Sequence, residues 1–124
     1  MIIENERESS QRKIVCFCAS SGEASEVSGK REREFVLSRQ LLRSGTAIGA
    51  LVREAEHAES KADFIHKMSV ALKEANETLY WLELLYQGNY IAEQRFRSID
   101  AHSKVLIKLL TAIVKTSKAT IHSE

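Results

Sequence analysis

The most regular stretch of the chain repeats apolar positions with the period of an α-helix. Between Ser60 and Tyr86 the apolar side chains recur at steps of three and four residues, at Phe64, Met68, Ala71, Leu72, Ala75, Leu79, Leu82 and Tyr86. This spacing places them on one stripe of a helix with about 3.6 residues per turn. Ser60 and Asp63 have the spacing of a capping box, which predicts that the helix begins there. Such a helix needs partner helices to cover its stripe.

A second helix is predicted over about residues 39–58. Its N-cap is expected at Ser38, with Leu37 packed onto Leu42 as a hydrophobic staple. The apolar side of this helix is formed by Leu41, Ile48, Leu51, Val52 and Ala55. The turn to the next helix falls near residues 58–60, so the two helices should pack antiparallel.

The helix that begins near Ser60 is predicted to end after Tyr86, at a glycine-containing turn. Gly88, in the sequence Gln-Gly-Asn, can take the left-handed conformation that often ends a helix. A last helix is then expected over about residues 92–118, with a buried side made of Phe96, Ile99, Leu106, Leu110, Ile113 and Val114.

The N-terminal third of the chain has a weaker pattern. Residues 4–20 are compatible with a short helix, residues 19–29 are rich in Ser and Gly and predict a loop, and residues 30–34 are a charge cluster. We therefore divide a single domain into residues 1–33, a weakly patterned helix and loop, and residues 34–120, the helical core. The chain lacks proline and has no alternating strand pattern. The predicted fold is all-α, an antiparallel up-down-up-down four-helix bundle whose first helix is atypical or partly disordered.

Composition narrows the classes of function. The net charge of +1 gives no strong global field for nucleic acid, although it leaves room for local basic surfaces. The sequence has no run of about 18 apolar residues, so we expect no membrane partner. The charged N-terminus does not resemble a secretory signal, and the two cysteines, Cys16 and Cys18, are too few for a disulfide framework. A cytoplasmic location is expected.

Metal and enzyme chemistry find little support in the sequence. Glu54 and His57 have the Glu-x-x-His spacing of di-metal bundles, and Asp63 and His66 approximate it. Both pairs flank a turn rather than the middle of the bundle, so surface or capping roles are favoured. Paired carboxylates at Glu74 and Glu77 are more consistent with salt bridges. We expect no catalytic residues, no metal and no cofactor, and therefore no enzyme.

Basic residues form two stripes that could contact phosphates. On the last helix they project within roughly 80° of one another at 100° per residue, and they are Arg97, Lys104, Lys108, Lys115 and Lys118. A smaller stripe on the second helix consists of Arg39, Arg43 and Arg53. Contact with RNA or DNA is one interpretation. A solvated face that serves solubility is the other.

Packing or oligomer contacts are predicted at five further positions. Gly45 and Gly49, four residues apart, suit close approach of a neighbouring helix, which would offset their cost of roughly 1 kcal/mol each. Tyr80, Trp81 and Leu84 leave the main apolar stripe of their helix. They could lie beneath a flanking helix or form a subunit interface, where Tyr and Trp are favoured anchors.

The sequence resembles the bacterial four-helix bundle proteins, also called the 23S rRNA intervening-sequence protein family. The resemblance covers about residues 34–118. It is carried by FVLSRQLLRSGTAIGA (residues 35–50), SKADFI (residues 60–65), ALKEANETLYWLELL (residues 71–85) and LLTAIVKTSK (residues 109–118). Residues that match the family's signatures are Gln40, Arg43, Ser44, Gly45, Ile48, Gly49, Glu74, Glu77 and Trp81, which we interpret as packing or assembly residues.

The resemblance implies a four-helix bundle that assembles as a ring-like homopentamer, without enzymatic activity or cofactor. Some members are encoded within 23S rRNA genes, and related proteins bind nucleic acid and a reverse transcriptase. We therefore expect a non-enzymatic, self-associating protein that binds nucleic acid; the alternative is a purely structural or protein-interaction module. Two departures from the family pattern are the polar segment at residues 15–29 and Ala92, which stands where a Ser or Thr cap is usual.

Overall fold

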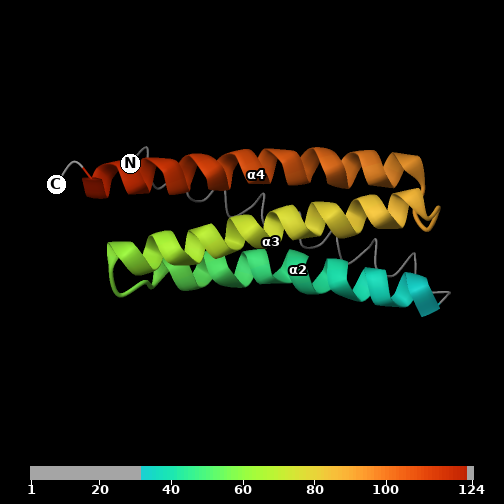
Figure 1. Cartoon of the computed structure of the whole chain (residues 1–124), viewed down its shortest axis with the longest axis horizontal. Helices are drawn as coiled ribbons and strands as arrows, with labels where there is room; N and C mark the ends of the chain where they lie inside the picture. Colours follow the sequence, from blue (N-terminus) through green and yellow to red (C-terminus); the bar gives the residue numbers. More distant parts are fainter. Residues whose placement is uncertain (1–31, 123–124) are drawn as a thin grey trace.

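The computed structural model describes residues 32–122 of the chain. It contains three helices, α2 (Glu32–Glu56), α3 (Lys61–Gln87) and α4 (Glu93–His122), and no strand within this range (Figure 1). The all-α prediction is confirmed. The predicted first helix and the loop after it fall almost wholly at residues 1–31, outside the described part, so the count of four helices stays a prediction.

The three helices run antiparallel, with α3 between α2 and α4 (Figure 1). Both outer helices pack against α3, whereas no Cα atom of α2 lies within 8 Å of one in α4. The short connections after Glu56 and Gln87 enforce this up-down arrangement, since they allow only neighbouring helices to follow each other.

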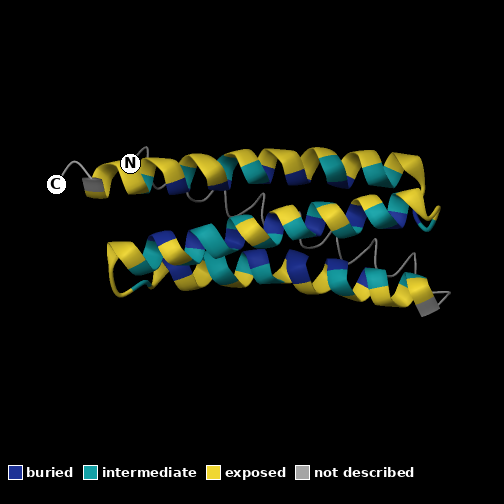
Figure 2. Cartoon of the chain, in the orientation of Figure 1, coloured by how far each residue is buried: buried dark blue, intermediate teal, exposed yellow. Residues whose placement is uncertain are grey.

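The core lies along the inward stripes of all three helices, which appear as the dark segments in Figure 2. Leu41 and Ile48 from α2, Leu82 and Leu85 from α3 and Leu110 from α4 are each at most 1% exposed. The other buried members of this cluster are Ala55, Met68, Ala71, Ala75, Ile91, Ile99, Leu106 and Val114. The apolar stripes predicted from the sequence therefore supply most of the buried side chains.

The start of α2 differs from the prediction. The helix already begins at Glu32, so Ser38 lies inside it, buried at 2% exposure, and is not an N-cap. The residues before Ser38 include arginine and glutamate, which favour helix, so the local cap signal did not decide where the helix begins.

The start of α3 agrees with the prediction. The Ser60 side chain accepts a hydrogen bond of 3.0 Å from the backbone N–H of Asp63. The Asp63 carboxylate in turn accepts a bond of 3.3 Å from the backbone N–H of Glu59, one residue before the cap itself. Two backbone donors at the helix start are thereby satisfied by side chains.

The end of α3 is a Schellman turn whose left-handed residue is Asn89. Its φ is 60°, whereas Gly88 has φ −79°, so the left-handed prediction for Gly88 is wrong by one position. The N–H of Tyr90 bonds to the carbonyl of Leu85 at 2.9 Å, and that of Asn89 to Tyr86 at 3.0 Å, the pattern of this motif. Asparagine tolerates the left-handed region better than most residues.

The last helix begins at Glu93, close to the predicted start, and continues past residue 118 to His122. Ala92 precedes it and accepts a backbone hydrogen bond of 3.0 Å from the N–H of Phe96. The Phe96 ring stacks on Tyr86 of α3 with centroids 4.1 Å apart, which joins this end of α4 to α3. Within residues 32–122, no helix is long and apolar enough to cross a membrane.

Candidate interaction surfaces

A polar cluster joins α2 to α3 near the middle of both helices. We call it the α2–α3 seam and define it by Gln40, Arg43, Glu74, Glu77 and Trp81. The Arg43 guanidinium forms an ion pair with Glu77 and lies 3.5 Å from Glu74 Oε2, while its Nε donates a 3.0 Å hydrogen bond to Gln40. The expectation that these two glutamates take part in salt bridges is confirmed.

The seam holds one cation against two carboxylates. Glu74 Oε2 is buried and makes no hydrogen bond, so its remaining partner within the described chain is the guanidinium at 3.5 Å. A buried carboxylate oxygen with such limited pairing depends strongly on the nearby positive charge. With Arg43 at +1 and the two glutamates at −2, the seam carries a net charge of −1.

Directly beneath the seam, two hydroxyl groups meet in the core. Thr78 Oγ1 lies 2.8 Å from Ser44 Oγ and 2.7 Å from the carbonyl of Glu74, and both side chains are buried. Ser44 Oγ also lies 3.0 Å from the carbonyl of Gln40. The hydroxyls therefore satisfy each other and the backbone, which avoids the penalty of a buried polar group without a partner.

Aromatic side chains continue the seam onto the surface of α3. The Trp81 indole is half-buried, and its Nε1–H donates a 3.1 Å hydrogen bond to the Glu77 carboxylate that also faces Arg43. Tyr80 is 54% exposed and contacts the Trp81 ring at a tilt of 60°. Packing beneath a flanking helix and a subunit interface therefore both stay predictions for Tyr80, since the predicted first helix lies outside the described residues.

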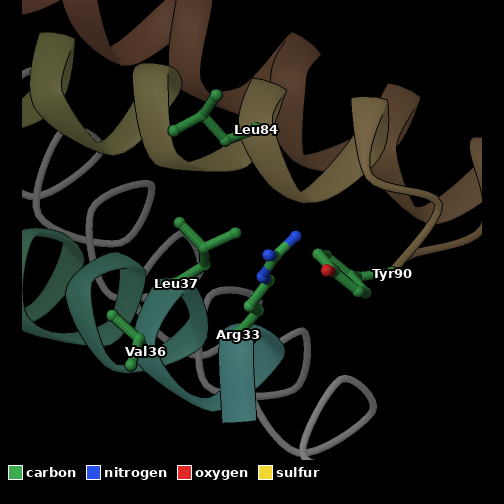
Figure 3. A pocket seen from close by; sticks show the side chains of 5 residues that line it. All are labelled: Arg33, Val36, Leu37, Leu84 and Tyr90. Atoms are coloured by element: carbon green, nitrogen blue, oxygen red, sulfur yellow. The ribbon is translucent and has the colours of Figure 1, made fainter. Parts of the chain in front are cut away.

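A shallow hollow of about 630 Å³ lies at the end of the seam near the α3–α4 turn. Figure 3 shows Leu84 of α3 facing Leu37 of α2, with Arg33 and Tyr90 closing one side and Val36 at the rim. Leu84 and Leu37 are half-buried and Val36 is 54% exposed. The predicted interface residue Leu84 is therefore part of a mainly apolar depression, which the sequence did not reveal.

The two predicted interface glycines lie on α2, where Gly45 is buried and Gly49 is half-buried. Their burial agrees with a packing position for each. Their role in an oligomer stays a prediction.

The basic residues of α4 divide into paired and unpaired groups. Arg97 forms an ion pair of 2.7 Å with Glu93, and Lys104 one of 2.9 Å with Asp100, each with a partner four residues earlier. The hydrogen bond from Lys104 to Asp100 and the charge of that carboxylate raise the pKa of Lys104, with a smaller contribution from Glu83 of α3. These two cations are partly neutralised where they stand.

Lys108, Lys115 and Lys118 are exposed and form no ion pair within the described part of the chain. Ten residues separate the first from the last, or about 15 Å along the helix. On α2, Arg39 and Arg53 are exposed and likewise have no ion-pair partner among residues 32–122, whereas Arg43 is engaged in the seam. Five of the eight predicted phosphate contacts therefore have no ion-pair partner among residues 32–122.

The two pairs with a spacing similar to that of metal ligands are Glu54 with His57 and Asp63 with His66, and their carboxylates have other partners. Glu54 forms an ion pair of 3.2 Å with Lys67, and Asp63 caps α3. Among the described residues, no three His, Cys, Asp or Glu side chains are grouped as a metal site would require. Cys16 and Cys18 lie outside that range.

Comparison with known proteins identifies the family. The family model for the 23S rRNA-intervening sequence protein matches residues 21–112. The chain belongs to this family. A similar solved structure is a 1.70 Å crystal structure of a protein of unknown function from the S23 ribosomal protein family of Bacteroides thetaiotaomicron. The two chains share 47% identity with a TM-score of 0.81, over 86% of this chain and 98% of that one. No curated protein matches.

Membership of the family agrees with the resemblance inferred from the sequence. Of the signature positions, Gln40, Arg43, Glu74, Glu77 and Trp81 meet in the α2–α3 seam, and Ser44 lies directly beneath it. The family signature on this chain is thus largely one contact between two helices.

Proposed function

We propose that this protein is a non-enzymatic, self-associating helical protein that binds the phosphate backbone of nucleic acid through α4, in the cytoplasm. The observation that carries the proposal is the set of exposed lysines at positions 108, 115 and 118, which have no ion-pair partner among residues 32–122. Lysines left unpaired on one helix face are free to replace the counterions of a polyphosphate.

Family membership adds support, because the family model takes its description from intervening sequences in 23S rRNA. The similar solved structure has no known function and neither adds to nor subtracts from the proposal. The phosphate backbone is common to RNA and DNA, so the binding measurement needs both.

Binding is tested by titrating labelled single-stranded RNA, single-stranded DNA and duplex DNA into the full chain at several salt concentrations. Three lysine–phosphate contacts predict that log K falls with log salt with a slope of about −2 for single strands and about −2.7 for duplex DNA. A slope near zero, or no binding at low salt for any of the three, would reject the nucleic-acid part of the proposal.

Self-association is supported by the surface that Tyr80 and Leu84 form together with Trp81 of the seam. Exposed Tyr and half-buried Trp side chains are common anchors of subunit contacts. The mass of the full chain in solution, measured by sedimentation over a range of concentrations, tests it. A species larger than the 14.0 kDa monomer is expected, with a pentamer as the assembly implied by the resemblance.

A purely structural or protein-interaction module is the second candidate. The ion pairs of Arg97 and Lys104 favour it, because they show that part of the basic stripe is already neutralised within α4. Self-association without any salt-dependent binding of nucleic acid would select this candidate.

A further inference from the structure

An exposed phenylalanine and an apolar hollow lie at the same height on α2. Phe35 is 57% exposed, and the residues that line the hollow from this helix, Arg33, Val36 and Leu37, lie within two positions of it in sequence. Successive residues of a helix point about 100° apart, so Phe35 is turned away from the depression beside it. The chain thus exposes a large apolar side chain, Phe35, on one side of α2 and has an apolar hollow on another side of the same helix.

The exposed side of α2 forms a regular stripe. Phe35, Arg39, Leu42, Thr46 and Arg53 recur at steps of three, four and seven residues, and all five are exposed. A stripe with this spacing lies along one face of a helix. Two arginines without an ion-pair partner in the described chain therefore stand in line with two exposed apolar side chains.

Opposite charges lie beside the exposed Phe35 and beside the apolar hollow. The α2–α3 seam has a net charge of −1 and a buried carboxylate oxygen on Glu74 that makes no hydrogen bond. Arg39 is one turn from Phe35 along the stripe, about 6 Å. Glu77 is two turns from Leu84 along α3, in the same direction because the helices are antiparallel.

We propose that Phe35 of one copy of the chain occupies the hollow at Leu37 and Leu84 of the next copy, with Arg39 against the carboxylates of the seam. The inference rests on the proposed self-association and names its contact. Because the donor and acceptor sides differ, the contact is head-to-tail. A head-to-tail contact can join more than two copies, since each copy keeps one donor side and one acceptor side.

Disulfide trapping between two single-cysteine copies tests the contact. In a Cys16→Ser, Cys18→Ser background, a Phe35→Cys copy is mixed with a tagged Leu84→Cys copy under mild oxidation. The matched control replaces Leu84→Cys with Val105→Cys, a position on α4 that is 45% exposed. A disulfide needs Cα atoms within about 7 Å, so only a true neighbour is trapped.

The expected result is a disulfide-linked dimer of one Phe35→Cys copy and one Leu84→Cys copy. The control mixture of Phe35→Cys and Val105→Cys copies should form no such dimer. Equal amounts in both mixtures would mean random collision and would overturn the inference. If the background variant is oligomeric by sedimentation but no 35–84 product forms, the named contact is wrong while self-association stands. A mass no larger than a dimer would overturn the head-to-tail arrangement, and a monomer at every concentration would overturn both proposals.

A second variant guards against misfolding at the half-buried Leu84. Phe35 is mostly exposed, so Phe35→Ala should leave the circular dichroism and thermal midpoint of the dissociated chain unchanged while lowering the assembled fraction. An unchanged assembled fraction would contradict a role for Phe35 as the inserted side chain.

Discussion

The Arg43 guanidinium of α2 pairs with the Glu77 carboxylate of α3 across the seam between the two helices. The same carboxylate accepts the indole hydrogen bond of Trp81, and the same guanidinium lies 3.5 Å from the buried oxygen of Glu74. Arg43 therefore contributes to the stability of the fold as well as to the charge of its surface.

Replacing Arg43 by methionine should lower the free energy of unfolding by about 1–2 kcal/mol, because Glu74 loses the charge that offsets its burial. The half-exposed position of Arg43 keeps the effect below that of a fully buried pair. Arg53→Met is the matched control and should change stability by less than about 0.5 kcal/mol. Urea unfolding at one fixed protein concentration measures both. Equal effects for the two variants would argue against a structural role for the ion pair.

The hydroxyl pair beneath the seam predicts non-additive energetics. Thr78→Val alone should cost about 1 kcal/mol, because Ser44 loses a buried partner 2.8 Å away. Combining it with Ser44→Ala should cost clearly less than the sum of the single variants, since neither hydroxyl is then left without its partner. A double-mutant cycle by urea unfolding provides the coupling energy, and a value near zero would show that the two groups act independently.

In the turn after α3, alanine should destabilise the chain at two adjacent residues for different reasons. A Cβ atom at Gly88 would lie 2.7 Å from a ring carbon of Tyr90, so Gly88→Ala should displace this ring and destabilise the chain. At Asn89, with φ 60°, alanine should cost about 1 kcal/mol whereas glycine should be neutral or stabilising. Thermal unfolding of the three variants checks the order. If Asn89→Ala proved as stable as Asn89→Gly, the left-handed turn would be contradicted.

Lys104 should titrate at a higher pH than an isolated lysine. Its hydrogen bond to Asp100 raises its pKa above the ordinary value of 10.5. A raised pKa in the folded state means that the pairing stabilises the fold fully below pH 10.5, and that this contribution is lost as the pH rises through the folded-state value. NMR titration of the Lys104 side chain should show a midpoint that Asp100→Asn lowers. An unchanged midpoint in Asp100→Asn would rule out the carboxylate as the cause.

The apolar stripe and the cap of α3 were predictable from the sequence, whereas the start of α2 and the residue that ends α3 were not. The bounds of α3 follow from its apolar stripe and from Ser60, both of which are local signals. The start of α2 was missed because Ser38 has the chemistry of a cap, although its position is buried within the helix. In the turn, both Gly88 and Asn89 can take the left-handed conformation, and local sequence does not decide between them.

Surface features formed by two helices together could not be predicted from either helix alone. A projection of α2 alone places Arg43 with Arg39 and Arg53 on a basic stripe, because it cannot show that Glu77 of another helix stands opposite. The register of α2 against α3 also creates the hollow at Leu37 and Leu84, so no single segment predicts it. By contrast, Glu93 and Asp100 stand one turn before Arg97 and Lys104, and this spacing could have revealed their ion pairs.

The most direct test of nucleic-acid binding compares two charge-matched double variants of the full chain. Lys115→Gln with Lys118→Gln removes two unpaired cations of α4, and Lys61→Gln with Lys73→Gln removes two exposed lysines of α3. If α4 binds the phosphates, the first pair should reduce the slope of log K against log salt by about 1.4 for single-stranded RNA, while the second leaves it unchanged. Equal reductions in both pairs, or none in either, would contradict binding through α4.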